Sequence, residues 1–244
     1  MPEHTTYALA VMLVAGLVKG LVGIGMPTIS VGLLGLVMPP MHAAALIVLP
    51  TFVSNMWQGL TGPHLVSMAR RMWPLLVATA LGTWGCAEIV SRAPVRSDKI
   101  WLGLVLLVTA VLALSRWQPR VPARLERMLA VLTGLGTGLV NGLTGTAAVP
   151  SVPFIQALGL SKDELIQAIG LLAMVATGSL GLLLGAKGLI DGTQAALSVV
   201  LLVPALAGVA VGTVVRGRLP EEVFRPAFLV CQGMLGAYLI GAGV

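Results

Sequence analysis

The amino-acid sequence predicts an all-α, polytopic membrane protein made of two inverted repeats, each a broken Gly/Pro hairpin followed by three transmembrane helices. Three observations carry this prediction. Hydrophobic residues make up 57% of the 244 residues and charged residues only 10%, which is more apolar surface than a water-soluble globule can bury. The apolar residues form long uncharged runs. The phrase Leu17–Gly23 (LVKGLVG) returns as Leu139–Gly145 (LVNGLTG), with five identical positions.

Eight hydrophobic segments form two sets of four. A hydrocarbon core about 30 Å thick needs roughly 20 apolar residues per helix, so long uncharged runs predict membrane spans. A polar stretch over 115–124, with two prolines and three arginines, separates the sets. We therefore expect a first transmembrane repeat over 1–116, a cytoplasmic linker over 117–127 and a second transmembrane repeat over 128–244. The hydrophobic segments span 7–38, 42–60, 72–90, 99–116, 128–160, 165–186, 191–214 and 224–242.

Two further sequence echoes support a duplication. Ala80–Thr83 (ALGT) returns as Ala210–Thr213 (AVGT), and Arg92–Pro94 (RAP) returns as Arg218–Pro220 (RLP). Together with the seven-residue phrase, these echoes occur in the same order in both halves. Internal repeats of this size in a membrane chain are typical of secondary transporters.

The first segment of each set contains a helix-breaking sequence. Each of these segments is too long for one ordinary span and short for two. Gly23–Pro27 interrupts the first segment, and Gly145–Pro150 interrupts the second. Glycine permits a turn, and proline suits the first position of a new helix because its missing N–H would be unpaired there anyway. We therefore predict that each repeat begins with a hairpin of two half-helices.

The charges of the loops favour this hairpin over a single crossing. With a hairpin in each repeat, the fourteen loop lysines and arginines divide ten to four between the two faces of the membrane. With single crossings they divide seven to seven, which the positive-inside rule disfavours. A hairpin and three further crossings invert the second repeat and place both termini on the periplasmic side. The two hairpin tips are then expected to approach each other near the midplane.

The hairpin tips are the predicted binding site. At a helix N-terminus the first N–H groups have no intrahelical partner and the macrodipole is positive, so an anion is stabilised there. Lys19 lies about one turn before the first tip, and a charge at such depth is usually functional. We expect a small anion to bind among Lys19, Gly23, Gly25, Met26, Pro27, Thr28, Asn141, Gly145, Thr146, Ala147, Ala148, Pro150 and Ser151.

Structural roles compete with binding at several positions in and near the tips. Lys19 could extend toward an interface, since its equivalent in the second repeat, Asn141, is neutral. Hydroxyl side chains in membrane helices commonly bond back to their own backbone. Glycines at small-xxx-small spacing most often serve close helix packing, and four have this spacing: Gly16, Gly20, Gly138 and Gly142.

Polar side chains in later segments are further candidates. Asn55, Gln58 and Thr177 either line a cavity or form hydrogen bonds between helices. Glu88 either relays a proton or pairs with Arg92 near an interface.

The sequence also argues against several protein classes. Cys86 and Cys231 lie in hydrophobic runs without a CxxC spacing or a neighbouring His, so we interpret them as packing residues and expect no metal. The loop bases face lipid headgroups and orient the protein, so we expect no nucleic-acid partner. No HExxH, GxSxG or Walker sequence is present, so we expect neither an enzyme nor a bound cofactor. A secondary carrier for a small anion, embedded in the lipid bilayer, is what remains.

These motifs resemble those of the TauE/SafE family of sulfite exporters over essentially the whole chain. The resemblance rests on the duplicated glycine phrase followed by a proline, the four-plus-four segments and the repeated Leu/Val-Gly-Thr. It implies an exporter of sulfite, sulfonates or other small organic anions in the bacterial inner membrane, and an importer or channel is the alternative. A non-transporting structural subunit of a membrane complex is the alternative from another class. The family commonly has Gly-x-Gly-Gly-Gly at the first break, where this chain has Gly23–Pro27 (GIGMP), so the substrate stays open.

Overall fold

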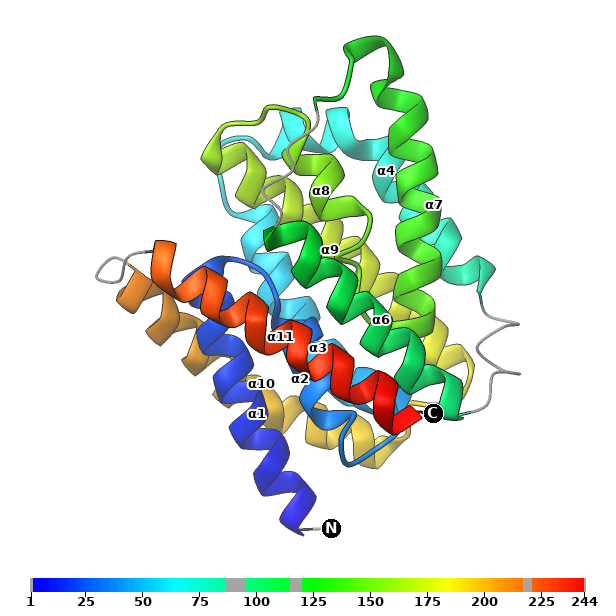
Figure 1. The fold of residues 1–244 in the computed structure, drawn as a ribbon, viewed down its shortest axis with the longest axis vertical. Coiled ribbons are helices and arrows are strands. Elements are labelled where there is room, and N and C mark those ends of the chain that lie inside the picture. The colour runs from blue at the N-terminus through cyan, green and yellow to red at the C-terminus, as the bar shows by residue number, and fades with distance from the viewer. Residues whose placement is uncertain (1, 87–94, 115–119, 217–220, 244) are drawn as a thin grey trace.

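The computed structural model describes residues 2–86, 95–114, 120–216 and 221–243, and every regular element within these ranges is a helix (Figure 1). The predicted all-α architecture is confirmed. In chain order the elements are α1 (Pro2–Val22), α2 (Met26–Leu34), α3 (Pro40–Leu60), α4 (Leu65–Gly85), α6 (Val95–Leu114), the short 3₁₀ helix η1 (Ala123–Leu125), α7 (Glu126–Thr144), α8 (Ser151–Gln156), α9 (Lys162–Ala186), α10 (Gly192–Arg216) and α11 (Glu221–Gly243).

Four of the described helices are long and apolar enough to cross a membrane. The apolar stretches are Thr5–Val22 within α1 and the whole of α3, α9 and α10. A shorter apolar stretch, Lys99–Leu112, lies in α6. Large apolar side chains remain on the outside of these helices, and Val203 of α10 is 72% exposed. Such surfaces suit contact with lipid rather than with water.

Both predicted helix breaks are present. The chain leaves α1 at Val22 and begins α2 at Met26, with Gly23 at φ 87° and Gly25 at φ 104°. In the second repeat Gly145, at φ 74°, ends α7. These positive φ angles are open to glycine and costly for residues with a β-carbon, which is why the breaks occur at these positions.

The two limbs of each hairpin differ in length, so the expectation of two half-helices is wrong for the first limbs. The helices α1 and α7 have 21 and 19 residues, whereas α2 and α8 have nine and six. The first limbs extend outward through polar residues that suit a helix start, such as Glu126 in the first turn of α7.

The predicted segment over 72–90 begins later than the helix α4. Arg70 and Arg71 lower the hydropathy of a stretch that is already helical from Leu65.

The closest helix pairs each join one helix of the first repeat to one of the second. The helix α1 packs on α10, α4 on α7, α3 on α9 and α6 on α11. Figure 1 shows α6 and α11 side by side across the front of the molecule and α4 beside α7 at the upper right. If each helix is replaced by its equivalent in the other repeat, the α1–α10 pair becomes the α7–α4 pair. The α3–α9 and α6–α11 pairs stay the same. The arrangement of these four closest pairs is therefore the same from either repeat.

Glycines bring the backbones of the paired helices into direct contact. A β-carbon on Gly20 would lie 2.4 Å from the Val209 carbonyl oxygen, and one on Gly138 would lie 2.2 Å from the Thr79 carbonyl oxygen. Gly16 meets the Ala205 carbonyl oxygen of α10 in the same way. A β-carbon on Gly142 would overlap the Cys86 sulfur just after α4 and lie 3.0 Å from the Thr83 carbonyl oxygen, so all four glycines serve close helix packing.

The echoed tetrapeptides meet the echoed seven-residue phrases across the repeats. Thr83 of ALGT approaches Gly142 of α7, where an added β-carbon would lie 3.0 Å from the Thr83 carbonyl oxygen. Gly212 of AVGT approaches α1, and a β-carbon added to it would lie 2.2 Å from the Leu17 carbonyl oxygen. The tetrapeptide of one repeat thus packs against the seven-residue phrase of the other repeat. This helix crossing is present twice, once between α4 and α7 and once between α10 and α1.

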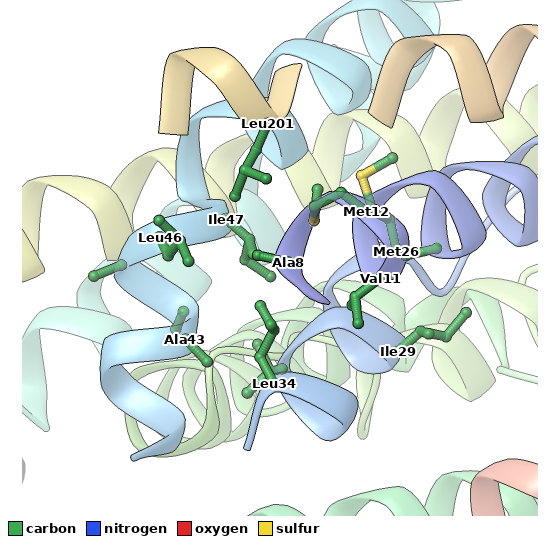
Figure 2. Packing of buried hydrophobic residues seen from close by; sticks show 14 of the residues in the cluster. Ala8, Val11, Met12, Met26, Ile29, Leu34, Ala43, Leu46, Ile47 and Leu201 are labelled. Atoms are coloured by element: carbon green, nitrogen blue, oxygen red, sulfur yellow. The ribbon is translucent and has the colours of Figure 1, made fainter. Parts of the chain in front are cut away.

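The largest apolar cluster surrounds the first hairpin. Figure 2 shows Met12 of α1, Met26 and Leu34 of α2, Ile47 of α3 and Leu201 of α10 packed together. A second cluster, which includes Phe154 and Ile155 of α8, surrounds the second hairpin. The short limbs α2 and α8 are therefore each held by apolar contacts.

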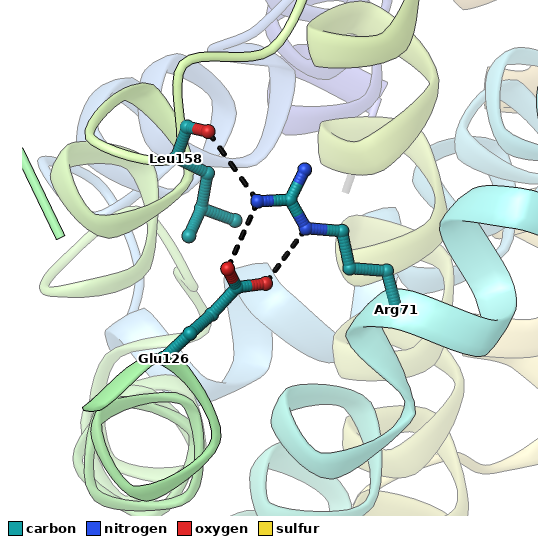
Figure 3. A network of polar contacts seen from close by, with 3 residues as sticks. All are labelled: Arg71, Glu126 and Leu158. Atoms are coloured by element: carbon teal, nitrogen blue, oxygen red, sulfur yellow. Dashed lines mark hydrogen bonds and ion pairs between the residues drawn. The ribbon is translucent and has the colours of Figure 1, made fainter. Parts of the chain in front are cut away.

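A polar contact ties three segments together at one end of the bundle. Arg71 of α4 donates to both carboxylate oxygens of Glu126 in α7, at 2.7 and 2.9 Å, and to the Leu158 carbonyl oxygen at 3.4 Å (Figure 3). The hydrogen bonds from Arg71 hold the pKa of the Glu126 carboxyl below its ordinary value. Because Arg71 is partly exposed, the pair stabilises the fold by no more than about 1 kcal/mol.

The glycine crossing generates a testable prediction. We expect Gly138→Ala to lower the free energy of unfolding by about 1–3 kcal/mol, because the new methyl group meets backbone atoms of α4 that cannot move aside. Gly185→Ala, at a helical site with no atom within 4 Å of the added carbon, should leave stability unchanged or slightly raised. Denaturant titration in detergent micelles measures both, and equal stabilities would contradict the crossing.

Candidate functional site

A cavity of about 120 Å³ lies between the two helix breaks. Gly23, Gly25 and Thr28 line it from the first break, and Gly145 and Ala148 line it from the second. The helices α1, α3, α6, α7, α8, α9 and α11 supply the remaining walls. Of the sixteen residues predicted from the sequence, the cavity brings together twelve: Lys19, Gly23, Gly25, Pro27, Thr28, Asn55, Gln58, Asn141, Gly145, Ala147, Ala148 and Thr177.

Four predicted residues do not line the cavity. Met26 is fully buried in the apolar cluster around the first hairpin. Thr146 is turned toward Thr144, with 3.1 Å between the two hydroxyl oxygens. Ser151 donates back to the Ala147 carbonyl oxygen, so the structural interpretation of this hydroxyl is the correct one. Pro150 forms the end of the second break, after a cis peptide bond, and is outside the lining.

Lys19 is the one charged side chain among the described residues that line the cavity. It is only 4% exposed, so it does not extend to an interface. Its ammonium donates to the Ser54 hydroxyl at 2.9 Å and to the Asn55 side-chain oxygen. Arg71–Glu126 is the ion pair found within the described residues, and it does not include Lys19. Both hydrogen-bond partners of Lys19, Ser54 and Asn55, are neutral. A buried cation with only neutral partners is costly and attracts an anion.

Asn55 links this cation to the second repeat. Its side-chain nitrogen donates to the Thr177 hydroxyl at 3.1 Å, and Thr177 donates to the Ala173 carbonyl oxygen of its own helix. Gln58, one turn further along α3, donates to the Ile166 carbonyl oxygen at 3.1 Å. These three residues line the cavity and also form hydrogen bonds, so both interpretations of them hold.

Asn141 occupies in the second repeat the position that Lys19 occupies in the first. It is buried, and its side-chain nitrogen donates to the Thr83 hydroxyl at 3.2 Å and to the Ala176 carbonyl oxygen at 2.9 Å. The two equivalent positions therefore both face the cavity, but only one of them carries charge.

The N-terminal end of α2 offers unpaired donors. Ile29 is the first residue of α2 whose N–H bonds to a backbone carbonyl, that of Gly25, at 2.9 Å. The N–H groups of Met26 and Thr28 have no acceptor among the described residues. The Thr28 side chain is only 5% exposed, lines the cavity and makes no hydrogen bond within the described part of the chain. This end can therefore donate to an anion.

The second break does not provide an equivalent helix end. The helix α8 has only six residues, too few to add up a substantial dipole, and Val152 already donates to the Ala148 carbonyl oxygen. The position that matches Gly25 is Ala147, whose β-carbon disfavours the left-handed backbone seen at Gly25. The chain therefore takes a longer path before α8 begins, and the expectation of two similar anion-binding ends is wrong for the second.

Several lining residues escaped the sequence analysis. Gln156 and Gln232 add amides, Thr109 adds a hydroxyl, and apolar side chains such as Leu112 and Leu229 complete the walls. Gln232 is an amide in an uncharged run, the same signal that selected Asn55, and it donates to the Leu106 carbonyl oxygen at 3.1 Å. The others have no motif around them. Glu88 and the side chain of Cys231 lie outside the described residues, whereas Cys86 is a free, buried thiol packed near Gly142.

Apolar helices of membrane-spanning length, around a cavity between two helix breaks that holds a buried lysine, are typical of the class of multi-pass membrane transporters. A comparison with family models matches residues 8–239 to the sulfite exporter TauE/SafE family. The chain belongs to this family, and it is accordingly a multi-pass membrane protein of a family of anion exporters. Comparison with curated proteins and with solved structures finds no match.

The hydrogen bonds of Lys19 generate a prediction on stability. We expect Asn55→Leu to lower the free energy of unfolding by about 1–3 kcal/mol, because it leaves the buried ammonium with one partner fewer. Lys19→Met should leave stability unchanged or raised, since it removes a charge that is costly to bury. In the double variant the loss caused by Asn55→Leu should shrink by more than 0.5 kcal/mol, the lower end of coupling energies for residues in contact. Additive losses in a double-mutant cycle would contradict the assigned contact.

Proposed function

We propose that the protein is a secondary transporter that exports small sulfur-containing or organic anions, such as sulfite or sulfonates. The anion binds between the two helix breaks and is passed across the membrane by alternating access. The observation that carries this proposal is the buried Lys19 ammonium, which faces the cavity and has only neutral partners. An anion entering the cavity would supply the missing negative charge.

The unpaired donors at the start of α2 support the same ligand. The N–H group of Thr28 and its hydroxyl lie in the same cavity lining as Lys19, so a single oxyanion could accept from both. Charge-assisted hydrogen bonds of this kind are short and about twice as strong as neutral ones.

The exchange symmetry of the four closest helix pairs supports alternating access. Two repeats with the same contacts and opposite orientations in the membrane can adopt two equivalent arrangements, one open to each side. The ten-to-four division of the loop bases supports the opposite orientations. The direction of transport, export, follows the family to which the chain belongs.

The transport proposal has a direct test with a matched control. In proteoliposomes we expect flux of sulfite or a sulfonate to fall about tenfold to a hundredfold in Lys19→Ala, since a hydrogen bond to a charged group is worth about 1.5–3 kcal/mol. Lys187→Ala removes an exposed lysine at the end of α9 and should transport normally. Unchanged flux in Lys19→Ala would discard the role of this residue. No flux of any anion by the wild-type protein would favour a structural subunit.

The location that goes with this proposal is the bacterial inner membrane, with both termini in the periplasm. A reporter enzyme that is active only in the periplasm should therefore be active when fused after Val244 and inactive when fused within 117–127. The reverse pattern would contradict the assigned orientation, and activity at both places would contradict the hairpin topology.

A further inference from the structure

Two equivalent positions of the repeated phrase line the cavity, and only one of them carries a cationic side chain. Lys19 and Asn141 hold the same place in the repeated phrase, and both are buried and line the cavity. We propose that the cavity selects anions with a single negative charge, and that the neutral Asn141 sets this limit. The inference rests on the proposed transport function and specifies its substrate class.

The positive charge available to a ligand falls short of two units. No Asp, Glu, Arg, His or second Lys is among the described residues that line the cavity, so Lys19 supplies at most one unit. The end of α2 adds a partial charge of about 0.5 unit at most. The other polar lining groups, such as Asn55, Gln58 and Gln156, are neutral amides.

Asn141 opposes a second negative group rather than accepting one. Both hydrogens of its amide nitrogen are engaged, one by the Thr83 hydroxyl and one by the Ala176 carbonyl oxygen. Only the side-chain carbonyl oxygen, which accepts no hydrogen bond from the described residues, is left to face a ligand. An oxygen that carries partial negative charge repels an anionic group.

The apolar walls make this charge limit strict. Leu112 and Leu229, together with Ile169 and Leu172 of α9, contribute no donors. A singly charged anion forms a neutral pair with Lys19 and can place an uncharged part against these side chains. A doubly charged anion leaves one charge uncompensated in a poorly hydrated site, where the loss of hydration is not repaid.

Methanesulfonate and sulfate separate the two cases. Both are tetrahedral around sulfur and similar in size, but one carries a methyl group where the other carries a second charged oxygen, and neither changes charge near neutral pH. In proteoliposomes we expect methanesulfonate flux to exceed sulfate flux by about tenfold or more at equal concentration. Asn141→Lys should shift this ratio toward sulfate by about tenfold, because it adds the second cation.

A second variant and a control complete the experiment. Gln156→Lys places a cation on the same cavity from a half-buried position of α8 and should shift the ratio in the same direction. Thr193→Lys adds the same charge at an exposed position of α10, away from the cavity, and should leave the ratio unchanged.

The possible outcomes separate the charge limit from the transport function. Wild-type protein that carries sulfate as well as methanesulfonate would overturn the charge limit and leave the proposed transport function standing. A ratio unchanged in both cavity variants would also overturn the limit, because the preference would then come from the dehydration of sulfate alone. Wild-type protein that carries no anion at all would overturn the transport function and the charge limit with it.

Discussion

Close backbone contact between the two repeats determines where the cavity forms. Gly16 and Gly20 of α1 lie against α10, and Gly138 and Gly142 of α7 lie against α4. Within a membrane the hydrophobic effect does not drive helices together, so dispersion contacts at such small residues hold the pairs. The breaks at Gly23 and Gly145 follow these contacts within one helical turn. The crossings therefore place both breaks next to one shared cavity, and any movement that opens the cavity must act on these helix pairs.

The cavity enclosed by these helix pairs holds a buried charge, the Lys19 ammonium, which costs free energy of folding. Lys19 is held by a hydroxyl and an amide and has no carboxylate partner among the described residues. A fold selected for stability alone would place an apolar residue there. The ammonium thus has a functional explanation more readily than a structural one, and the unpaired donors at the start of α2 point to the same anionic ligand.

The two repeats share their packing and differ in their chemistry. The glycines at the helix crossings match in both, whereas Lys19 is matched by Asn141 and Gly25 by Ala147. The first difference removes a charge, and the second lies in a break that is longer than the one before α2. The matching helix crossings therefore surround an asymmetric site, in which the cation and the open helix end both come from the first half of the chain.

The sequence by itself indicated the order of the helices, the glycines that pack closely and the position of both breaks. These features follow from hydrophobicity and from the backbone freedom of Gly and Pro, which are local properties. Only the tertiary structure decided which side chains face the cavity, because the rotation of each helix is set by the neighbours on which it packs. Met26 and Thr146 are turned away for this reason, and Gln156 is turned inward without any motif to mark it. The length of α8 was likewise beyond sequence reasoning, since it depends on how the chain after Gly145 fits between α7 and α9.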